Sequence, residues 1–451
     1  MALGETMRSL RVSLVMGAVG LAFIFLSPIM MVMSQVVEEF VVASGTARFA
    51  EQPQIRGNIV VWQRYGEAFG ESDAIQAANI GTIGGSVVEL AKFPAHRIGV
   101  LLSEQYLFFG SGNGFPDGSP VIARQIDLAL QGKANDIVVS DVGYAVASNT
   151  SHVFIRVSAF EDIRYAKHYY AKQLCTLDDS PPESLFEVAS FKSETFLTRT
   201  EAASDKYFVW QDRDGADSDD TWKIFAKPIK ELFTPGAERM VFETNLSKQP
   251  LGYYGAYLAL YDNLIVVQGA VDKRSDSIRG IYLIDLDTGA GPLPIAETDS
   301  KSTALQWPAI SNEYIVWSQA DEFSKRRAFA QRLDRGDLDG VPFQISSGFG
   351  GGNWIAIYNS VAVWNGVAPS AVGPVNAIIG VELASAMTSD VGDVDQNGRI
   401  DLTDAVAVLN FLFLGGRQPR LRVSDTDRNG VLTLNDAIVV LAYLFQGTQI
   451  R

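Results

Sequence analysis

Two stretches near the carboxyl end of the chain place oxygen-bearing side chains at a spacing that suits a calcium ion. Calcium takes about six to eight oxygen ligands, and a twelve-residue loop supplies them from its positions 1, 3, 5, 7, 9 and 12. In the first loop these positions are Asp393, Asp395, Asn397, the carbonyl of Arg399, Asp401 and Asp404. In the second they are Asp425, Asp427, Asn429, the carbonyl of Val431, Thr433 and Asp436. The spacing therefore predicts two bound Ca²⁺ ions, one in each loop.

The two loops are copies of one repeat. Of the 23 positions from Asp393 to Gly415, 12 are identical in the copy that lies 32 residues later. The shared residues after each loop include apolar positions such as Leu409 and Leu441, which favour one short helix per copy. Without a cation the clustered carboxylates repel one another, so we expect the fold of this segment to depend on the metal. Two metal-free acidic turns are the alternative.

The repeat resembles a dockerin domain, a calcium-stabilised module that binds a cohesin on a scaffold or a cell surface. The resemblance covers residues 391–451, where each loop carries Asp at position 12 and leads into a single apolar helix. It implies a cohesin-like protein partner that contacts loop positions 10 and 11. Those positions are Leu402, Thr403, Leu434 and Asn435. The leucines depart from the Ser/Thr pairs that are typical of the family, and burial in the core of the module is the alternative for them.

The composition limits the classes of partner. The chain has 451 residues, with 37 Lys and Arg against 52 Asp and Glu, which gives a net charge of −15. Phosphate backbones repel an acidic chain of this kind, so we expect no nucleic-acid partner. The single cysteine, Cys175, rules out a disulfide within the chain, and its place beside an apolar strand pattern predicts a buried side chain.

The amino terminus predicts export. Arg8 and Arg11 precede the stretch 12–33, which contains no charged residue. A basic start followed by an apolar run is typical of a secretory signal peptide, here residues 1–34. The run is also long enough to span a bilayer, so retention as an N-terminal membrane anchor is the alternative. In both cases we expect the rest of the chain to be secreted or displayed at the cell surface.

A second repeat fills the middle of the chain. Seven short turns are each followed by an apolar burst, such as GNIVVWQ or NEYIVWS. The aligned burst residues are Trp62, Phe109, Ile155, Trp210, Val267, Trp317 and Trp364. They lie 46 to 57 residues apart, near the ~40–50 residues of one four-stranded propeller blade. The β-branched and aromatic composition favours strands, with no helical spacing, and we expect the burst residues to form the core between blades.

The two ends of this region predict how the ring closes. The seventh unit ends after its third strand, 376–383, and an unassigned strand pattern, 39–43, follows the amino-terminal segment. Pairing these strands joins both ends in one blade and leaves few exposed strand edges. The expected fold is therefore all-β, a seven-bladed β-propeller over residues 38–384 closed by its N-terminal strand. A linker of residues 385–390 and a small α-helical, EF-hand-like domain follow.

The seven units resemble the TolB-type β-propeller repeats of bacterial secreted and periplasmic proteins. The match is clearest in Gly57–Gln63, Asp205–Asp212 and Ser311–Ser318, whose bursts follow the pattern GNxIVWQD. The resemblance implies the propeller architecture and leaves the ligand of the propeller open.

No compact motif indicates catalytic residues. The three histidines, His96, His152 and His168, are not spaced as a metal-binding pair. A pair of glycosidase carboxylates stays open, because such a pair is defined by its separation in space. Two acidic loops, 212–220 and 334–340, are interpreted as surface turns, with cation binding as the alternative. The aromatic residues near loops, which either pack or stack on sugar rings, are Tyr65, Phe69, Tyr253, Tyr254 and Trp354.

Two functions are compatible with this organisation, and a third hypothesis is that the C-terminal module meets no cohesin and only packs against the propeller. The first is a secreted, non-catalytic binding protein, in which the propeller offers a face to a polysaccharide or protein ligand and the C-terminal module attaches it to a cohesin-type partner. The alternative is an extracellular polysaccharide-degrading enzyme, a glycoside hydrolase or a lyase, because dockerins usually accompany such enzymes. The sequence by itself favours the first function, since it contains no visible catalytic group of residues.

Overall fold

The computed structural model of this chain describes most of the residues after the amino-terminal segment. The described residues are 39–45, 51–65, 73–81, 86–93, 100–110, 120–161, 164–177, 185–193, 201–213, 221–245, 257–269, 279–298, 303–321, 325–334, 336–346, 351–368, 374–383, 392–394, 400–414, 424–427 and 432–448. All of them belong to the larger of two compact units, Val36–Arg451. The smaller unit, Met1–Gln35, contains the predicted signal peptide and lies outside the described residues. No helix in the described part of the chain is long and apolar enough to cross a membrane.

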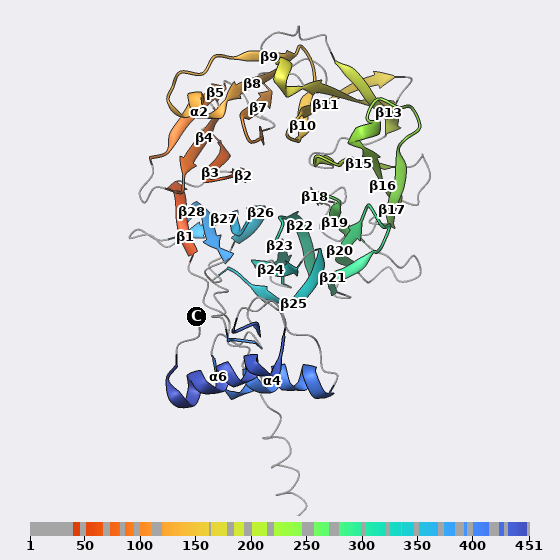
Figure 1. The fold of residues 1–451 in the computed structure, drawn as a ribbon. Coiled ribbons are helices and arrows are strands. Elements are labelled where there is room, and N and C mark those ends of the chain that lie inside the picture. Colours follow the sequence, from red (N-terminus) through yellow and green to blue (C-terminus); the bar gives the residue numbers. More distant parts are fainter. Residues whose placement is uncertain are drawn as a thin grey trace, which may run out of the picture. The chain divides into compact units, whose positions relative to one another are not determined.

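Seven four-stranded antiparallel sheets, counted over the described residues, form a β-propeller (Figure 1). In each of the first six sheets the strands follow in chain order, from an inner strand at the centre of the ring to an outer strand. Short runs of β-branched and aromatic residues favour such strands because these side chains fit a pleated, half-buried surface. The predicted seven-bladed propeller is confirmed.

The blades are numbered in chain order. Blade 1 contains β2 (Glu51–Arg56), β3 (Ile59–Arg64), β4 (Asp73–Asn79) and β5 (Val88–Phe93). Blade 2 contains β6 (Val100–Leu102), β7 (Tyr106–Gly110), β8 (Val121–Gln125) and β9 (Ile137–Ser140). Blade 3 contains β10 (Tyr144–Ser148), β11 (His152–Glu161), β12 (Arg164–Gln173) and β13 (Phe186–Ser193). Blade 4 contains β14 (Glu201–Ala203), β15 (Tyr207–Arg213), β16 (Thr221–Pro228) and β17 (Arg239–Asn245).

The remaining three blades complete the ring. Blade 5 contains β18 (Leu258–Tyr261), β19 (Leu264–Gly269), β20 (Arg279–Asp285) and β21 (Leu293–Thr298). Blade 6 contains β22 (Ala304–Ile310), β23 (Tyr314–Ala320), β24 (Arg326–Asp334) and β25 (Asp337–Gln344). Blade 7 contains β26 (Gly351–Tyr358), β27 (Val361–Ala368), β28 (Val375–Glu382) and the amino-terminal strand β1 (Glu39–Gly45).

The amino-terminal strand closes the last blade, as predicted. β1 pairs antiparallel with β28, with Glu39 opposite Val381 and Gly45 opposite Asn376. Gly380 of β28 lies against the ring of Phe40, so that a Cβ added there would be only 2.5 Å from the ring. This closure covers an edge of β28 that would otherwise offer its backbone groups to another chain.

A hydrophobic cluster lies between each pair of adjacent blades. The seven burst residues lie on the second strand of their blades and are buried, which confirms the predicted inter-blade core. Between blades 3 and 4, for example, the rings of Phe154 and Phe208 stack with centroids 4.3 Å apart, and Trp210 lies 5.4 Å from Phe208. Each large apolar side chain buried in this way contributes about 1.5–3 kcal/mol to folding. The repeats therefore hold together through apolar contact with both neighbours.

Three cations on the third strands of blades 2, 3 and 4 also join neighbouring blades, of which Lys172 and Lys227 are buried and Arg124 is half-buried. The Lys172 ammonium donates to the carbonyl of Val139 at 3.2 Å, and the Lys227 ammonium donates to that of Val188 at 2.8 Å. The guanidinium of Arg124 donates to the carbonyl of Leu90 in the same way. Each acceptor lies on the fourth strand of the preceding blade. A lysine in a strand pattern usually indicates the solvent side, so these contacts were not predictable from the sequence.

Three inner strands, β2, β22 and β26, carry a bulge at the same place. Gln52, Trp307 and Trp354 there have φ angles of 56°, 51° and 53°. Each lies ten residues before the burst residue of its blade, and blades 6, 7 and 1 are neighbours in the ring. A left-handed backbone at a residue with a large side chain costs about 1–3 kcal/mol, so the surrounding structure must hold it in place.

Two expectations about the propeller are wrong. Helical structure is present, in α2 (Ile126–Leu130) and in the 3₁₀ turns η1 (Leu174–Thr176) and η2 (Ile229–Glu231). Cys175 is exposed rather than buried, because β12 ends at Gln173 and the chain turns through η1. In that turn Leu174 and Leu177 take the buried positions and Cys175 faces outward.

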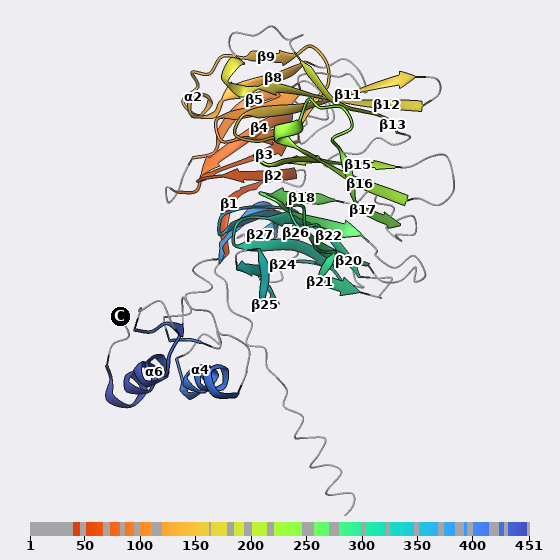
Figure 2. The ribbon, with the colours of Figure 1, turned by 45° about the vertical axis from the view of Figure 1, so that its right-hand side comes forward.

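The carboxyl-terminal module contains two helices, α4 (Leu402–Leu414) and α6 (Leu434–Gln446). They lie side by side (Figure 1, Figure 2) and share a small core. Its fully buried members are Val394, Ala405, Val408, Ala437 and Val440. The helix α6 begins at a Thr433 cap, whose hydroxyl accepts from the amide of Asn435 at 3.2 Å, and ends at Gly447 with φ of 69°. The predicted small helical region after the propeller is confirmed.

Candidate metal centre and propeller channel

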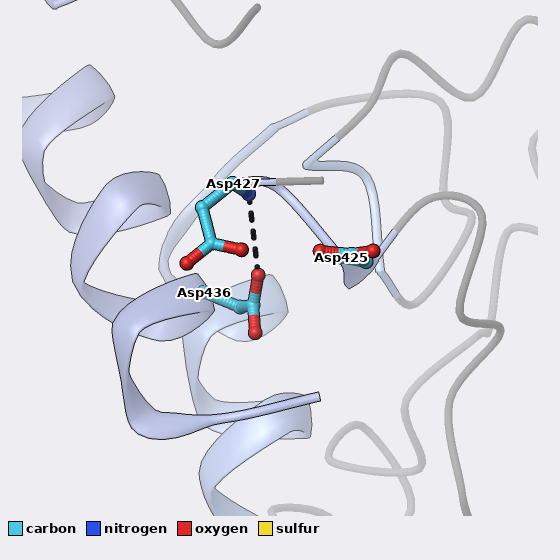
Figure 3. Close-up of side chains that lie close together, drawn as sticks. All are labelled: Asp425, Asp427 and Asp436. Atoms are coloured by element: carbon cyan, nitrogen blue, oxygen red, sulfur yellow. Dashed lines mark hydrogen bonds between the residues drawn. The ribbon is translucent and has the colours of Figure 1, made fainter. Parts of the chain in front are cut away.

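The second acidic loop brings three of its predicted ligands together. One carboxylate oxygen from each of Asp425, Asp427 and Asp436 lies within 4.8 Å of the others (Figure 3). They occupy loop positions 1, 3 and 12, so residues up to eleven positions apart in sequence face one point. Oxygen ligands of one calcium ion lie 2.3–2.6 Å from the metal and hence within about 5 Å of one another. The three carboxylates fit such an ion.

Asp436 is the buried anchor of this group. Its carboxylate accepts hydrogen bonds from the backbone amides of Thr433 and Thr426, both at 2.8 Å, and of Asp427 at 3.3 Å (Figure 3). The Thr433 contact is half of a capping box at the start of α6, which satisfies backbone donors at a helix end. The capping role is enough to account for Asp436 even if no metal binds. It does not account for the approach of the Asp425 and Asp427 carboxylates to Asp436. Three carboxylates at this separation repel one another unless a cation or protons compensate them.

The first loop has the same local design where it is described. The Asp404 carboxylate accepts the amide of Asp401 at 2.7 Å, and the Asp401 carboxylate accepts the amide of Thr403 at 2.8 Å. Asp393 is buried at the start of the loop. The remaining predicted ligands, Asp395, Asn397, Arg399, Asn429 and Val431, lie outside the described residues.

The four residues predicted to contact a partner have different surroundings. Leu402 and Leu434 are 54% and 48% exposed, so the alternative that they belong to the core is wrong. The core positions are taken instead by Ala405 and Ala437, three residues further along each helix. Thr403 and Asn435 are also exposed, but both bond back to their own loop. The hydroxyl of Thr403 donates to Asp401 at 2.6 Å, and the side-chain amide of Asn435 donates to Asp427 at 2.8 Å.

The exposed leucines continue into an apolar strip along each helix. On α4 the strip contains Leu402, Val406 and Phe413, and on α6 it contains Leu434, Ile438 and Phe445. Each residue of the second strip lies 32 positions after its equivalent in the first. All six side chains are exposed. Apolar groups left in water at matching places on two helices mark a surface that can bind a partner.

In the propeller, a hollow lies at the end of the central channel where the seven inner strands turn into the second strands. Its volume is about 540 Å³, and every blade contributes to its wall. We call this end the turn face. Neighbouring turns are tied together: the amide and hydroxyl of Thr150 donate to Asp205 at 2.9 and 2.7 Å, and Lys206 pairs with Asp262 at 2.8 Å. These contacts make the turn face a fixed, polar rim.

The carboxyl groups of this rim have different environments. Glu201 is buried and accepts from the guanidinium of Arg156 at 2.8 Å and from the hydroxyl of Tyr169 at 2.9 Å. Burial opposes the charge of Arg156, but the carboxylate of Glu201 outweighs it and raises the pKa of Arg156. Glu201 is therefore committed to a structural ion pair. Glu104, Asp205 and Asp262 line the hollow and are exposed to solvent.

The histidines do not form a catalytic group in the described part of the chain. Ser190 and Glu187 both approach His168, but both contact the same ring nitrogen, Nδ1, at 2.9 and 3.4 Å. A proton relay needs the nucleophile and the carboxylate on opposite nitrogens. His152 contacts the hydroxyl of Ser151 at 2.8 Å, and burial lowers its pKa. His96 lies outside the described residues.

The other candidates from the sequence give little support to a second metal site. Asp334 ends β24 and Asp337 begins β25 directly opposite it, so the 334–340 segment is a tight hairpin. Most of the 212–220 loop lies outside the described residues, as do Phe69, Tyr253 and Tyr254. Trp354 stacks on Trp307 with centroids 5.2 Å apart.

Comparisons with known proteins identify the fold of the propeller. No family model matches the chain, and no curated protein is similar to it in sequence. The β-propeller domain of the trilobed protease from Pyrococcus furiosus has 12% identity and a TM-score of 0.52, over 74% of this chain and 95% of that one. Puromycin hydrolase has 13% identity and a TM-score of 0.51, over 78% of this chain. The match spans 55% of the puromycin hydrolase chain, about half of its length.

These resemblances correct the first functional expectation. The propellers that this chain resembles belong to a protease and a hydrolase, which are enzymes. The expectation of a non-catalytic binding protein is therefore wrong, and the enzyme alternative is favoured. The lack of a compact motif was not a sign against catalysis, because catalytic groups are defined by their separation in space. The chain has the fold of the seven-bladed propellers that occur in peptidases.

Proposed function

We propose that this chain acts in extracellular polysaccharide breakdown, as an enzyme whose propeller binds the substrate and whose C-terminal module is a calcium-dependent, dockerin-like attachment domain. The observation that carries the proposal is the convergence of Asp425, Asp427 and Asp436 in a loop that the chain repeats. A paired calcium loop of this kind resembles dockerins, and dockerins usually accompany polysaccharide-degrading enzymes. The TolB-type propeller resemblance and the predicted signal peptide agree with action outside the cytoplasm.

Calcium would act here as a structural ion. In the second loop Asp425, Asp427 and Asp436 would hold it through carboxylate oxygens, with Thr433 at position 9. In the first loop the equivalent described positions are Asp393, Asp401 and Asp404. The ion supplies positive charge that relieves the repulsion of the clustered carboxylates. It thereby fixes the starts of α4 and α6 and the strips that these helices carry.

The two apolar strips support a protein partner for this module, of the cohesin type. Their exposed leucines and phenylalanines offer apolar area with well-defined shape, which is what the centre of a protein interface uses. We expect Leu402→Asp together with Leu434→Asp to abolish capture of a cohesin-type partner in a pull-down, while the calcium affinity measured by titration calorimetry is unchanged. Thr448→Asp, at an exposed position after α6, is the control. Capture that survives the double change would remove the strips from the interface.

The turn face of the propeller supports the substrate site. It is concave, its volume of about 540 Å³ admits several sugar units, and Glu104, Asp205 and Asp262 line it. Cleavage of a glycosidic bond needs one carboxylic acid to protonate the leaving oxygen and a second carboxylate to act from the other side of the sugar. Glu201 cannot serve, because its charge is taken up by Arg156.

The test uses the full chain on a panel of neutral and acidic polysaccharides in the presence of calcium, with reducing ends and unsaturated products measured. We expect product release that falls by about 100-fold or more in Glu104→Gln or Asp205→Asn, as expected on loss of an acid–base group. Glu231→Gln, on η2 away from the channel lining, is the matched control. Absence of product from every polysaccharide would overturn the enzymatic proposal and leave the calcium module to be judged by its own titration.

A further inference from the structure

The opposite end of the channel, where the inner strands begin, carries an aromatic cluster. We call this end the start face. Trp307 and Trp354 stack with ring centroids 5.2 Å apart, and Tyr257 lies edge-on to Trp354 at 6.2 Å. The three residues come from equivalent positions, each ten residues before the burst residue of blades 5, 6 and 7. Trp307 is buried within the cluster, whereas Tyr257 and Trp354 are partly exposed.

A cationic segment adjoins this cluster. The guanidinium of Arg326 lies over the ring of Trp307 at 4.4 Å and donates to Gln306 at 2.6 Å. A Cβ added to Gly352 would lie 3.0 Å from the carbonyl carbon of Arg327, so the start of β24 runs against the part of β26 that carries Trp354. Arg326 is the middle member of three consecutive cations, and the outer two, Lys325 and Arg327, are exposed. Asp321 lies beside this segment, and its carboxylate accepts the amide of Lys325 at 2.9 Å.

The backbone of the cluster is held in an unfavourable state. Trp307 and Trp354 both have left-handed φ angles, which a glycine or asparagine would adopt more easily than a tryptophan. Propeller packing alone does not require this left-handed backbone. In the blades other than 6, 7 and 1, no described residue at the equivalent position of the inner strand has a positive φ angle. Strain of this kind is found where a side chain must be aimed in a particular direction.

We infer that the start face holds a subsite for an acidic sugar ring, a hexuronate unit of an anionic polysaccharide. The apolar face of the pyranose would stack on Trp354 beside Tyr257, as flat rings do on indoles. Its carboxylate would bind the cations of β24, because guanidinium groups match a carboxylate in shape and charge. The chain as a whole has a net charge of −15, so a local group of cations is what an anionic ligand needs in order to bind it.

The subsite rests on the proposed polysaccharide function and names its substrate class, and binding can be measured apart from turnover. Titration calorimetry of the full chain with hexuronate oligosaccharides, matched neutral oligosaccharides and a single-stranded oligonucleotide tests it. We expect the hexuronates to bind, with an affinity that falls as salt is raised. Trp354→Gly removes the indole while keeping a residue that favours the same backbone, and it should weaken binding about tenfold.

Charge and ring variants separate the two parts of the subsite. Arg326→Gln, at the cation that lies over Trp307, should weaken hexuronate binding about three- to tenfold and remove much of its salt dependence. Trp354→Tyr keeps an aromatic ring and should retain most of the affinity. Phe233→Ala after η2 and Lys230→Gln on η2 are exposed controls outside the channel lining and should bind as the parent chain does. Melting curves of all variants confirm that each one folds.

Several results would overturn this inference. The inference fails if hexuronates do not bind at millimolar concentration, or if neutral sugars bind as tightly as hexuronates. It also fails if the oligonucleotide binds more tightly than hexuronates, or if Trp354→Gly has the same hexuronate affinity as the parent chain. The two proposals fail separately. Hexuronate binding without any product release leaves the subsite standing and removes the enzymatic function. Product release that is unchanged in Trp354→Gly leaves the enzymatic function standing and removes the subsite.

Discussion

In the propeller each repeat buries its apolar burst against both neighbours, whereas in the carboxyl-terminal module two repeats share only a small aliphatic core. The propeller holds tryptophans and phenylalanines at the centre of its inter-blade clusters, and the last blade is completed by the first strand of the chain. The module has alanines and valines at its fully buried positions and places acidic residues at its helix starts. Repetition thus has two results: it closes a ring of apolar contacts in the propeller, and it brings carboxylates together in the second loop of the module.

This difference matters because the two parts should respond to different conditions. Apolar contacts between blades do not depend on any solute, and the closed ring leaves few edges. The module is too small to be held by its core alone, and domains of this size usually need metals or disulfides. With one cysteine in the chain, a disulfide is not available.

The largest expected effect is the loss of the module on removal of calcium. In the full chain, a chelator, or Asp393→Ala combined with Asp425→Ala, should abolish the unfolding transition of α4 and α6 and leave that of the propeller unchanged. Calorimetry and far-ultraviolet circular dichroism measure both transitions in one sample. A module transition that persists in chelator would mean that capping and the small core suffice without an ion.

The ring closure is tested next, at Gly380. Gly380→Ala forces a methyl group to within 2.5 Å of the Phe40 ring, so we expect a loss of about 1–3 kcal/mol in the free energy of unfolding of the propeller. Gly110→Ala is the matched control, since a Cβ there meets no atom within 4 Å. Chemical denaturation gives both values. Equal stability of the two variants would show that the contact between β1 and β28 is not needed for the ring.

A comparison of blades 4 and 5 isolates the buried cations. Lys227 and Ile284 occupy the same third-strand position, opposite Phe208 and Ile265. Lys227→Met leaves the Val188 carbonyl and the nearby Glu238 carboxylate without their partner, so stability should fall, towards the lower end of about 1–3 kcal/mol.

The matched change for blade 5 is Ile284→Met, which exchanges one apolar side chain for another and should cost less than about 1.5 kcal/mol. Denaturation midpoints of both variants, compared with the parent chain, decide the question. If Lys227→Met is as stable as the parent, the hydrogen bond and ion pair of the buried ammonium do not contribute to the stability of blade 4.

The smallest effect concerns His152, whose pKa is lowered by burial. The unfolded chain keeps the ordinary value of about 6.5, so below that pH it binds a proton that the folded chain does not bind. This contribution to stability is therefore present above about pH 6.5 and is lost as the pH falls below it. His152→Gln should make the melting temperature fall less steeply between pH 8 and about pH 5.5. A parallel slope in both proteins would contradict this assignment.

Much of the propeller was predictable because its signals are local and repeated. The burst residues and the closing strand are visible as short patterns, since each strand needs the same burial in every blade. The exposure of Cys175 was not predictable, because the strand alternation ends with β12. The 3₁₀ turn η1 begins at the next residue and changes which side chains face the core. The burial of Lys172 was missed for a related reason: its acceptor, the carbonyl of Val139, lies 33 residues away on another blade.

The sequence by itself determined the order of the acidic residues in the two loops and the number of blades, because both follow from spacing along the chain. Only the tertiary structure decided which side chains meet. It brought Asp425, Asp427 and Asp436 to one point, turned Leu402 and Leu434 outward, and stacked Trp307 on Trp354 across two blades. Spacing fixes contacts within one repeat, whereas contacts between repeats depend on how the chain curves.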